Sequence, residues 1–172
     1  MKALAWCRCL TVASDAVIIR QALPEDGAAL LDLMQQLAVF EGYRENFRVT
    51  LDDLSQRLFE RQDFCVLVAE VDGQLAGMLV YYFLPFSYDL TPWILVKELF
   101  VAPGWRGKNI GQQLMVALAQ HAVTAGSHKI RWDVLATNDN AKAFYRALGA
   151  QSDDDWELFS LSRPAIEQLA AR

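Results

Sequence analysis

The sequence predicts a mixed α/β fold, in which short strands and amphipathic helices alternate. Two observations support this class. From Val17 onward, short apolar runs are followed by segments whose apolar residues recur at helical spacing. The chain has 172 residues, of which 53% are hydrophobic, so it can bury one core of ordinary size. We therefore expect an N-terminal extension at residues 1–16 and a single domain at residues 17–172.

The first half of the domain is expected to hold two helices and a hairpin. Residues 17–20 are a β-branched run, and Pro24 opens a helix with leucines on one face. Thr50, with an acid three residues later, is typical of a second helix start. Two apolar runs, residues 64–71 and 74–83, flank an Asp-Gly pair, which supplies the positive φ angles of a tight hairpin turn.

The second half is expected to continue the alternation of strand and helix. The helix before Gly126 has a clear apolar face, and the glycine is a typical helix end. The expected elements are, in order, strand 93–101, helix 108–125, strand 129–135, helix 140–148, strand 157–161 and helix 164–172.

Composition and charge argue against several classes of partner. Sixteen Lys and Arg against 21 Asp and Glu give a net charge of −5, whereas a nucleic-acid binder carries a basic face. The longest apolar run, residues 75–86, is shorter than the roughly 20 residues of a membrane helix. Arg8 interrupts the N-terminal apolar run before it reaches signal-peptide length. We expect a cytoplasmic protein without nucleic-acid or membrane partners.

Cysteine and histidine usage predicts neither a disulfide framework nor a metal site. The cysteines are Cys7, Cys9 and Cys65, an odd number without zinc-type spacing. His121 and His128 have no cysteine or carboxylate pattern near them. Three reduced thiols and no metal are therefore expected.

One segment is typical of an anion site: a strand and turn, then a basic glycine-containing loop that opens a helix. Backbone N–H groups at a helix N-terminus, together with the helix dipole, bind anions. Arg106 and Lys108 add positive charge, and Gly107 and Gly111 allow close approach. The loop lacks the Gly-Lys-Ser/Thr ending of a P-loop and the third glycine of a dinucleotide fingerprint. It predicts a pyrophosphate site, and the alternative is a charged turn before an amphipathic helix.

A second segment, residues 138–149, has the pattern Asn-x-x-Ala-x-x-Phe-Tyr-x-x-Leu-Gly. Together with the Arg-Gly loop and the acidic-hydrophobic strand before it, this segment closely resembles the GNAT superfamily of acyl-CoA-dependent N-acetyltransferases. The resemblance covers about residues 17–161. Within the superfamily the sequence is similar to the spermidine/spermine and thialysine acetyltransferases, through residues 37–41, 67–70, 81–83 and 87–89.

This resemblance implies the GNAT fold, a mixed and mostly antiparallel sheet flanked by helices. Two central parallel strands, here residues 93–101 and 129–135, splay apart so that pantetheine lies between them. The implied co-substrate is acetyl-CoA, and no metal is implied. The coenzyme-binding residues that the resemblance implies are Leu99, Phe100, Val101, Arg106, Gly107, Lys108, Asn109, Ile110, Gly111, Gln112, Asn138 and Ala141.

Acetyl transfer to an amine needs a base and an acid. An alkyl amine with a pKa near 10.4 is protonated at pH 7, a deficit of roughly 4–5 kcal/mol, so a base must remove its proton. Glu98 is the candidate base, and an N–H near Leu99, aimed by a β-bulge, would stabilise the oxyanion. Tyr145 matches the family's general acid for the departing thiolate. The alternatives are a structural carboxylate for Glu98 and a core aromatic for Tyr145.

Two residues depart from the family's pattern. Asn109 stands where the loop usually has glycine; asparagine tolerates left-handed backbone angles, but its side chain can crowd the phosphates. Lys97 stands where polyamine acetyltransferases have the first of two adjacent acids, so it would repel a polyamine or bind a substrate carboxylate. Glu41 and Asp89 are expected at the border of the acceptor pocket by resemblance; the alternative for both is solvated surface charge.

We therefore expect an enzyme that moves acetyl from acetyl-CoA to a small primary amine, polyamine- or amino-acid-like, in a ternary complex. A covalent acyl-cysteine is disfavoured because Cys65 lies in a predicted strand with no histidine nearby. The alternatives are acetylation of a protein N-terminus or lysine, a non-catalytic acyl-CoA-binding module, and a purely structural interaction domain. The resemblance also implies a homodimer.

Overall fold

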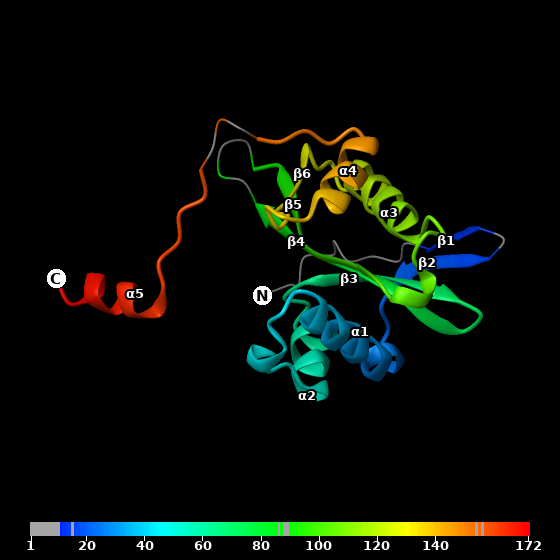
Figure 1. The fold of residues 1–172 in the computed structure, drawn as a ribbon, viewed down its shortest axis with the longest axis horizontal. Coiled ribbons are helices and arrows are strands. Elements are labelled where there is room, and N and C mark those ends of the chain that lie inside the picture. Colours follow the sequence, from blue (N-terminus) through cyan, green and yellow to red (C-terminus); the bar gives the residue numbers. More distant parts are fainter. Residues whose placement is uncertain (1–10, 15, 86, 88–89, 154, 156) are drawn as a thin grey trace. The chain divides into compact units, whose positions relative to one another are not determined.

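The computed structural model describes residues 11–14, 16–85, 87, 90–153, 155 and 157–172 (Figure 1). The chain forms two compact units, Met1–Asp133 and Val134–Arg172. The first unit contains the whole sheet and three helices. The second contains α4 (Asp139–Ala147) and α5 (Arg163–Ala170), and none of its described residues is buried.

The sheet of the first unit has six strands in chain order. All neighbours pair antiparallel except β5 and β6, which are parallel. The mixed, mostly antiparallel sheet with one parallel pair is therefore confirmed. The strands are β1 (Thr11–Ser14), β2 (Val17–Gln21), β3 (Cys65–Val71), β4 (Gln74–Pro85), β5 (Pro92–Val101) and β6 (Lys129–Trp132).

Helices cover both faces of this sheet. Figure 1 shows α1 (Gly27–Phe40) and α2 (Leu51–Leu54) on one face and α3 (Ile110–Thr124) on the other. Short helical turns η1 (Pro24–Asp26), η2 (Arg44–Asn46), η3 (Ser55–Glu60) and η4 (Pro103–Trp105) join these elements. Among the described residues, no helix is long and apolar enough to cross a membrane.

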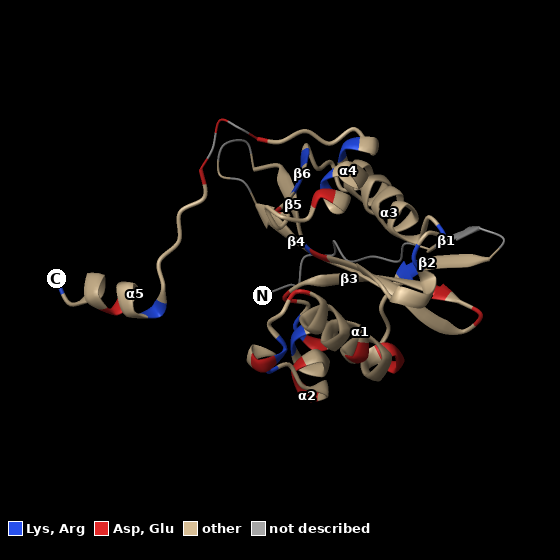
Figure 2. Ribbon diagram, in the orientation of Figure 1, with Lys and Arg blue, Asp and Glu red and all other residues tan. Residues whose placement is uncertain are grey.

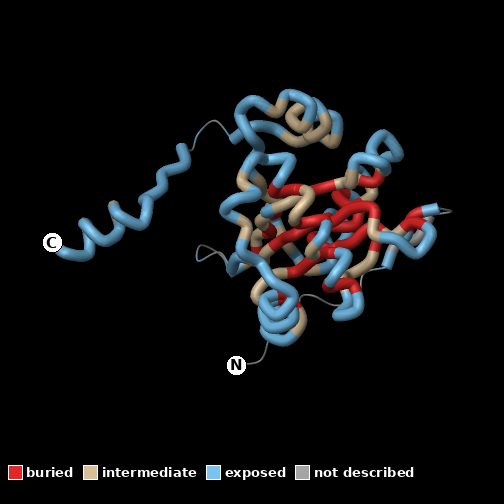
Figure 3. Tube along the Cα trace, turned by 60° about the horizontal axis from the view of Figure 1, so that its bottom comes forward, coloured by how far each residue is buried: buried red, intermediate tan, exposed pale blue. Residues whose placement is uncertain are grey.

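The core of the first unit lies between the sheet and its covering helices, and buried positions concentrate in the strands (Figure 3). On the α1 side, leucines of α1, α2 and η3 pack on alternate residues of β3, β4 and β5. The strand residues on this face are Val66, Val68, Met78, Val80 and Phe100. Because side chains alternate along a strand, Leu79 and Tyr81 face α3 instead.

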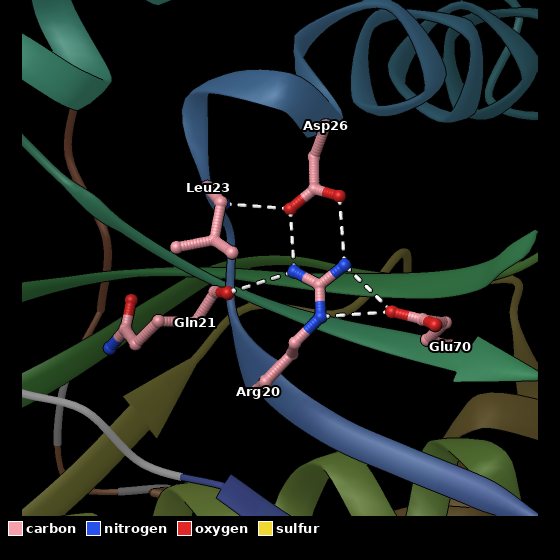
Figure 4. A network of polar contacts seen from close by, with 5 residues as sticks. All are labelled: Arg20, Gln21, Leu23, Asp26 and Glu70. Carbon is pink, nitrogen blue, oxygen red and sulfur yellow. Dashed lines mark hydrogen bonds and ion pairs between the residues drawn. The ribbon is translucent and has the colours of Figure 1, made fainter. Parts of the chain in front are cut away.

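A partly buried ion-pair network fixes the start of α1 (Figure 4). Two nitrogens of Arg20 donate to Asp26 at 2.6 and 2.9 Å, and Arg20 also donates to Glu70 at 2.7 and 2.9 Å. The Leu23 amide donates to Asp26 at 2.7 Å. Burial raises the pKa of Asp26, but the hydrogen bonds from Arg20 and Leu23 outweigh it, so the pKa lies below its usual value. The network ties β2 and β3 to the turn that begins α1.

Several sequence expectations are confirmed locally. The hairpin joins β3 and β4 through Asp72 and Gly73, whose φ angles are +50° and +75°. Thr50 caps α2, accepting from the Asp53 amide, while Asp53 accepts from the Thr50 amide. The helix expected at residues 108–125 is α3.

Two other expectations are wrong, and a third is right only in part. Residues 157–161 form no strand, and Leu158 and Phe159 are about four-fifths exposed. An apolar run specifies a strand only where a neighbouring strand accepts its backbone hydrogen bonds. Cys65 is disulfide-bonded, so three reduced thiols are not what the structure shows. The strand expected at residues 129–135 also ends early, at Trp132.

Candidate active site

The parallel strands pair over only part of their length. Trp93–Val96 of β5 pair with Lys129–Trp132 of β6. On the β6 side of β5, no described residue pairs with residues 97–101. The Ala102 amide donates to Ala76 at 2.9 Å, toward β4. Since backbone groups alternate in direction along a strand, Leu99 and Val101 point to the open side. β5 therefore presents a free edge where the resemblance places pantetheine.

A β-bulge lies at the start of this free edge. Val80 of β4 is opposite Glu98, but Tyr81 is opposite Val96, so Lys97 is an extra residue on β5. The bulge was expected in this strand to aim a backbone N–H. It also turns Glu98 to the face of α1 and α2, because Glu98 shares that face with Val80. Val96 faces the α3 side, as Tyr81 does.

Glu98 is the centre of a group that we call the acidic cluster: Glu41, Tyr43, Tyr82 and Glu98. Burial and the nearby Glu41 carboxylate raise the pKa of Glu98, while Lys97 lowers it by less. Burial, with the charges of Glu98 and Glu41, raises the pKa of Tyr43 to about 12. Burial and Glu98 also raise the pKa of Tyr82. The cluster therefore combines two carboxylates and two protonated phenols on the α1 face.

Sequence reasoning found two members of this cluster and missed two. Glu41 and Glu98 were expected, and the structure brings them together. Tyr82 was noticed only as part of the family likeness. Its position two residues after Val80 places it on the Glu98 face, and this period-two spacing is the signal that could have found it. Tyr43 lies in the loop after α1, where periodicity gives no such signal.

Acidic and basic residues are mixed on and around α1 and α2 (Figure 2). Lys97 is exposed beside the cluster. Asp89, the other expected pocket residue, lies outside the described residues. Among the described residues, no group of three or more His, Cys, Asp or Glu could hold a metal ion.

The glycine-containing loop presents unpaired amides at the start of α3. Asn109 is the N-cap of α3 and has the left-handed conformation, with φ +59° and ψ +13°. Gly107 also has a positive φ, +76°. Within the described part of the chain, no amide of residues 107–112 donates to a backbone oxygen, and Gln113 is the first to do so. Such a row of N–H groups at a helix N-terminus fits a diphosphate.

The two cations of this loop contact aromatic rings. The Lys108 ammonium lies 4.4 Å from the centre of the Trp105 ring. The Arg106 guanidinium lies 4.9 Å from the centre of the Phe40 ring, and its Nε donates to the Val101 carbonyl at 3.0 Å. The Arg106 side chain thus folds back onto the protein, which the sequence did not indicate.

Three expected site residues lie in the second unit. Asn138 is the N-cap of α4, and its Oδ1 accepts from the Ala141 amide at 3.0 Å. Tyr145 is partly buried, with its ring centre 5.1 Å from that of Phe144. The coenzyme contacts of Asn138 and Ala141 and the acid role of Tyr145 stay predictions.

Comparison with known protein families identifies the family of this chain. The model of the acetyltransferase (GNAT) family matches residues 29–150, the segment that contains the free edge, the loop and α4. The chain belongs to the GNAT acetyltransferase family. It is an acetyl-CoA-dependent N-acetyltransferase.

Individual relatives agree with this assignment. The chain is 28% identical to the thialysine N-epsilon-acetyltransferase of Bos taurus over 91% of its length and 98% of the relative's. It is 24% identical to an L-ornithine N5-acetyltransferase of Arabidopsis thaliana, over 88% and 86%. A V. cholerae integron cassette protein superposes with a TM-score of 0.78, at 24% identity, covering 92% of this chain and all of that one. The last likeness concerns the fold alone.

Proposed function

We propose that this N-acetyltransferase acetylates the primary amine of a small, amino-acid-like substrate by direct attack in a ternary complex. The acidic cluster carries the proposal, because two carboxylates attract an ammonium group and one of them, Glu98, can accept its proton. Two relatives support the class, since thialysine and ornithine are both amino acids with a side-chain amine. A third, a spermidine/spermine acetyltransferase-like protein, keeps polyamines as the competing class.

Acetyl-CoA would bind along features already described in the first unit. The amides of residues 107–112 would hold the diphosphate, and the open-side backbone groups of Leu99 and the Val101 amide would pair with pantetheine. This places the thioester near the bulge and Glu98. The Leu99 N–H would then be available to stabilise the oxyanion.

The chemistry requires three proton movements. Glu98 takes a proton from the substrate ammonium, directly or through water, and the neutral nitrogen attacks the thioester carbonyl carbon. The carbon–sulfur bond breaks, and the CoA thiolate takes a proton from the Tyr145 hydroxyl. The second proton, which the nitrogen loses on becoming an amide, restores that hydroxyl, and Glu98 releases its proton to solvent, leaving an acetamide and CoA. The raised pKa of Glu98 makes it a stronger base than an ordinary carboxylate.

Lys97 supports an amino-acid-like acceptor over a polyamine. It is exposed at the bulge, next to Glu98, and it stands where the polyamine enzymes have the first of two adjacent acids. An ammonium there can pair with a substrate carboxylate and repels a second substrate ammonium. The substrate would place its amine toward Glu98 and its carboxylate toward Lys97.

A panel of amines tests this function, with release of the CoA thiol as the readout. Ornithine, lysine and thialysine are expected to give higher kcat/KM than spermidine or an N-terminal peptide. Tyr145→Phe is expected to lower kcat while leaving acetyl-CoA binding, measured by calorimetry, nearly unchanged. A wide preference for spermidine or for peptides would contradict the acceptor class. Coenzyme binding without turnover on any amine would instead show a non-catalytic acyl-CoA-binding module.

We also propose a homodimer, from the family resemblance, and a cytoplasmic location without nucleic-acid or membrane partners, from composition and charge. Light scattering of the purified protein checks the oligomeric state, and a mass of 19.4 kDa, that of one chain, would contradict the dimer.

A further inference from the structure

Arg106 connects the coenzyme loop to the end of α1. Its Nε donates to the Val101 carbonyl at 3.0 Å, which fixes the side chain to the free edge of β5. Its guanidinium lies 4.9 Å from the ring centre of Phe40 and 5.6 Å from that of Phe100. Phe100 belongs to the buried core. The side chain therefore spans from β5 to the last residue of α1.

Phe40 is an aromatic residue that the Arg106 guanidinium covers. It is the last residue of α1 and is 56% exposed, although it is a large aromatic residue. The guanidinium over its ring is a cation–π contact, which favours one position of that ring. The next residue, Glu41, belongs to the acidic cluster. The Glu41 amide donates to the Leu37 carbonyl, so Glu41 continues the last turn of α1. A contact that holds the Phe40 end of α1 to β5 therefore also holds Glu41 near Glu98.

We propose that Arg106 is a positioning residue for the acceptor amine, holding Phe40 and thus Glu41 against the edge that receives the coenzyme. This inference rests on the proposed function, whose acceptor site is the acidic cluster. It assigns to Arg106 a role different from that of a phosphate ligand. It also couples the binding of the two substrates. The Arg106 side chain contacts both the β5 edge expected to hold the coenzyme and the end of α1 that carries Glu41.

Steady-state kinetics of three single variants, and of the double variant Arg106→Gln with Phe40→Leu, test this role. Arg106→Gln and Phe40→Leu are each expected to raise the KM for the amine about five- to tenfold, with a change below about twofold in the KM for acetyl-CoA. Arg106→Lys is expected to behave like Arg106→Gln, because lysine keeps the charge but loses the planar stack and the Nε donor. The double variant should be no worse than the more affected single variant, since both remove one contact.

The opposite pattern would overturn the proposal. If Arg106 only bound phosphate, Arg106→Gln would weaken coenzyme binding, Arg106→Lys would restore it, and Phe40→Leu would change neither KM. Arg163→Gln is the control for the loss of one positive charge, since Arg163 pairs with Glu167 in α5. It is expected to leave both KM values unchanged.

A readout without substrate separates this inference from the proposed function. The Glu98 carboxyl can be titrated by NMR. The charged groups that act on it are Glu41 and Lys97, and the phenols of Tyr43 and Tyr82 lie within reach of its charge. If Arg106 positions Glu41, then Arg106→Gln and Phe40→Leu both lower the pKa of Glu98, because Glu41 is no longer held near it. If Arg106 acts only as a cation, its removal raises that pKa and Phe40→Leu has no effect. This result decides the inference even if every amine of the panel fails.

Discussion

Glu98 lies directly opposite Val80, and it does so only because Lys97 is an extra residue between Glu98 and Val96. Without this bulge, Val96 and Glu98 would face the same side of the sheet. The bulge thus brings the Glu98 carboxylate to the face of α1 and α2, where Glu41 and two tyrosines surround it.

Glu98→Gln is expected to lower kcat/KM at pH 7 by about a hundredfold, because an amide cannot accept the substrate's proton. In the wild type, activity should be lost as the pH falls through the raised pKa of Glu98.

The contribution of Glu98 to the free energy of unfolding should instead decrease as the pH rises. A folded-state pKa above the unfolded value favours the fold at low pH, and this contribution is lost as the pH rises through it. Urea unfolding should therefore find Glu98→Gln more stable than the wild type at pH 7, with no advantage below about pH 4.

Lys97→Glu is expected to move the acceptor preference toward polyamines. Reversing this charge attracts a second substrate ammonium and repels a substrate carboxylate, so the ratio of kcat/KM for spermidine over ornithine should rise about tenfold. Lys97→Gln should give an intermediate ratio, because it removes the charge without reversing it. Equal ratios in all three proteins would show that Lys97 does not contact the acceptor.

Asn109 tests the geometry of the diphosphate loop. Its φ of +59° is left-handed, so Asn109→Ala is expected to lower the free energy of unfolding by about 1 kcal/mol. Asn109→Gly should keep the stability within a few tenths of a kcal/mol. The glycine variant should also bind CoA at least as tightly as the wild type, since it removes a side chain near the diphosphate. Weaker binding by the glycine variant in calorimetry would show that the asparagine side chain is itself a ligand.

Gly77 tests the fit between β4 and β5. A Cβ at this position would lie 2.8 Å from the Phe100 carbonyl oxygen, and that oxygen belongs to the backbone. Gly77→Ala is therefore expected to lower the free energy of unfolding by about 2 kcal/mol or more. Gly104→Ala is the matched control: a Cβ there meets nothing within 4 Å, so its effect should stay within about 0.5 kcal/mol. Equal effects in urea unfolding would contradict the close approach.

Asp26→Asn tests the network that begins α1. Breaking its pairing with Arg20 is expected to cost about 2–3 kcal/mol of unfolding free energy at pH 7. A lowered folded-state pKa stabilises the fold above the unfolded value of 3.8 and is lost as the pH falls through the folded value. The difference from the wild type should therefore shrink below about pH 4. Asp32→Asn, at an exposed carboxylate bonded only to Gln36, should have little effect at any pH.

The sequence allowed much of the first unit to be predicted, because its signals are local. Asp72-Gly73 requires a hairpin turn, and Asn109 has the left-handed conformation that its tolerance for such angles suggested. The strand expected at residues 157–161 failed, since pairing needs a partner strand that a local apolar run cannot specify. The inward fold of Arg106 could not be found either, because it depends on Phe40, which lies 66 residues earlier in the chain.

Within β5, the two ends of one strand differ in how well their backbone is protected. Residues up to Val96 have neighbours on both sides, whereas Leu99 and Val101 have backbone groups open to water on one side. Amide protons on the open side exchange with solvent more readily than those inside a ladder. A bound pantetheine arm would act as a seventh strand here, and hydrogen exchange at Leu99 and Val101 would slow while exchange at the paired end stayed the same.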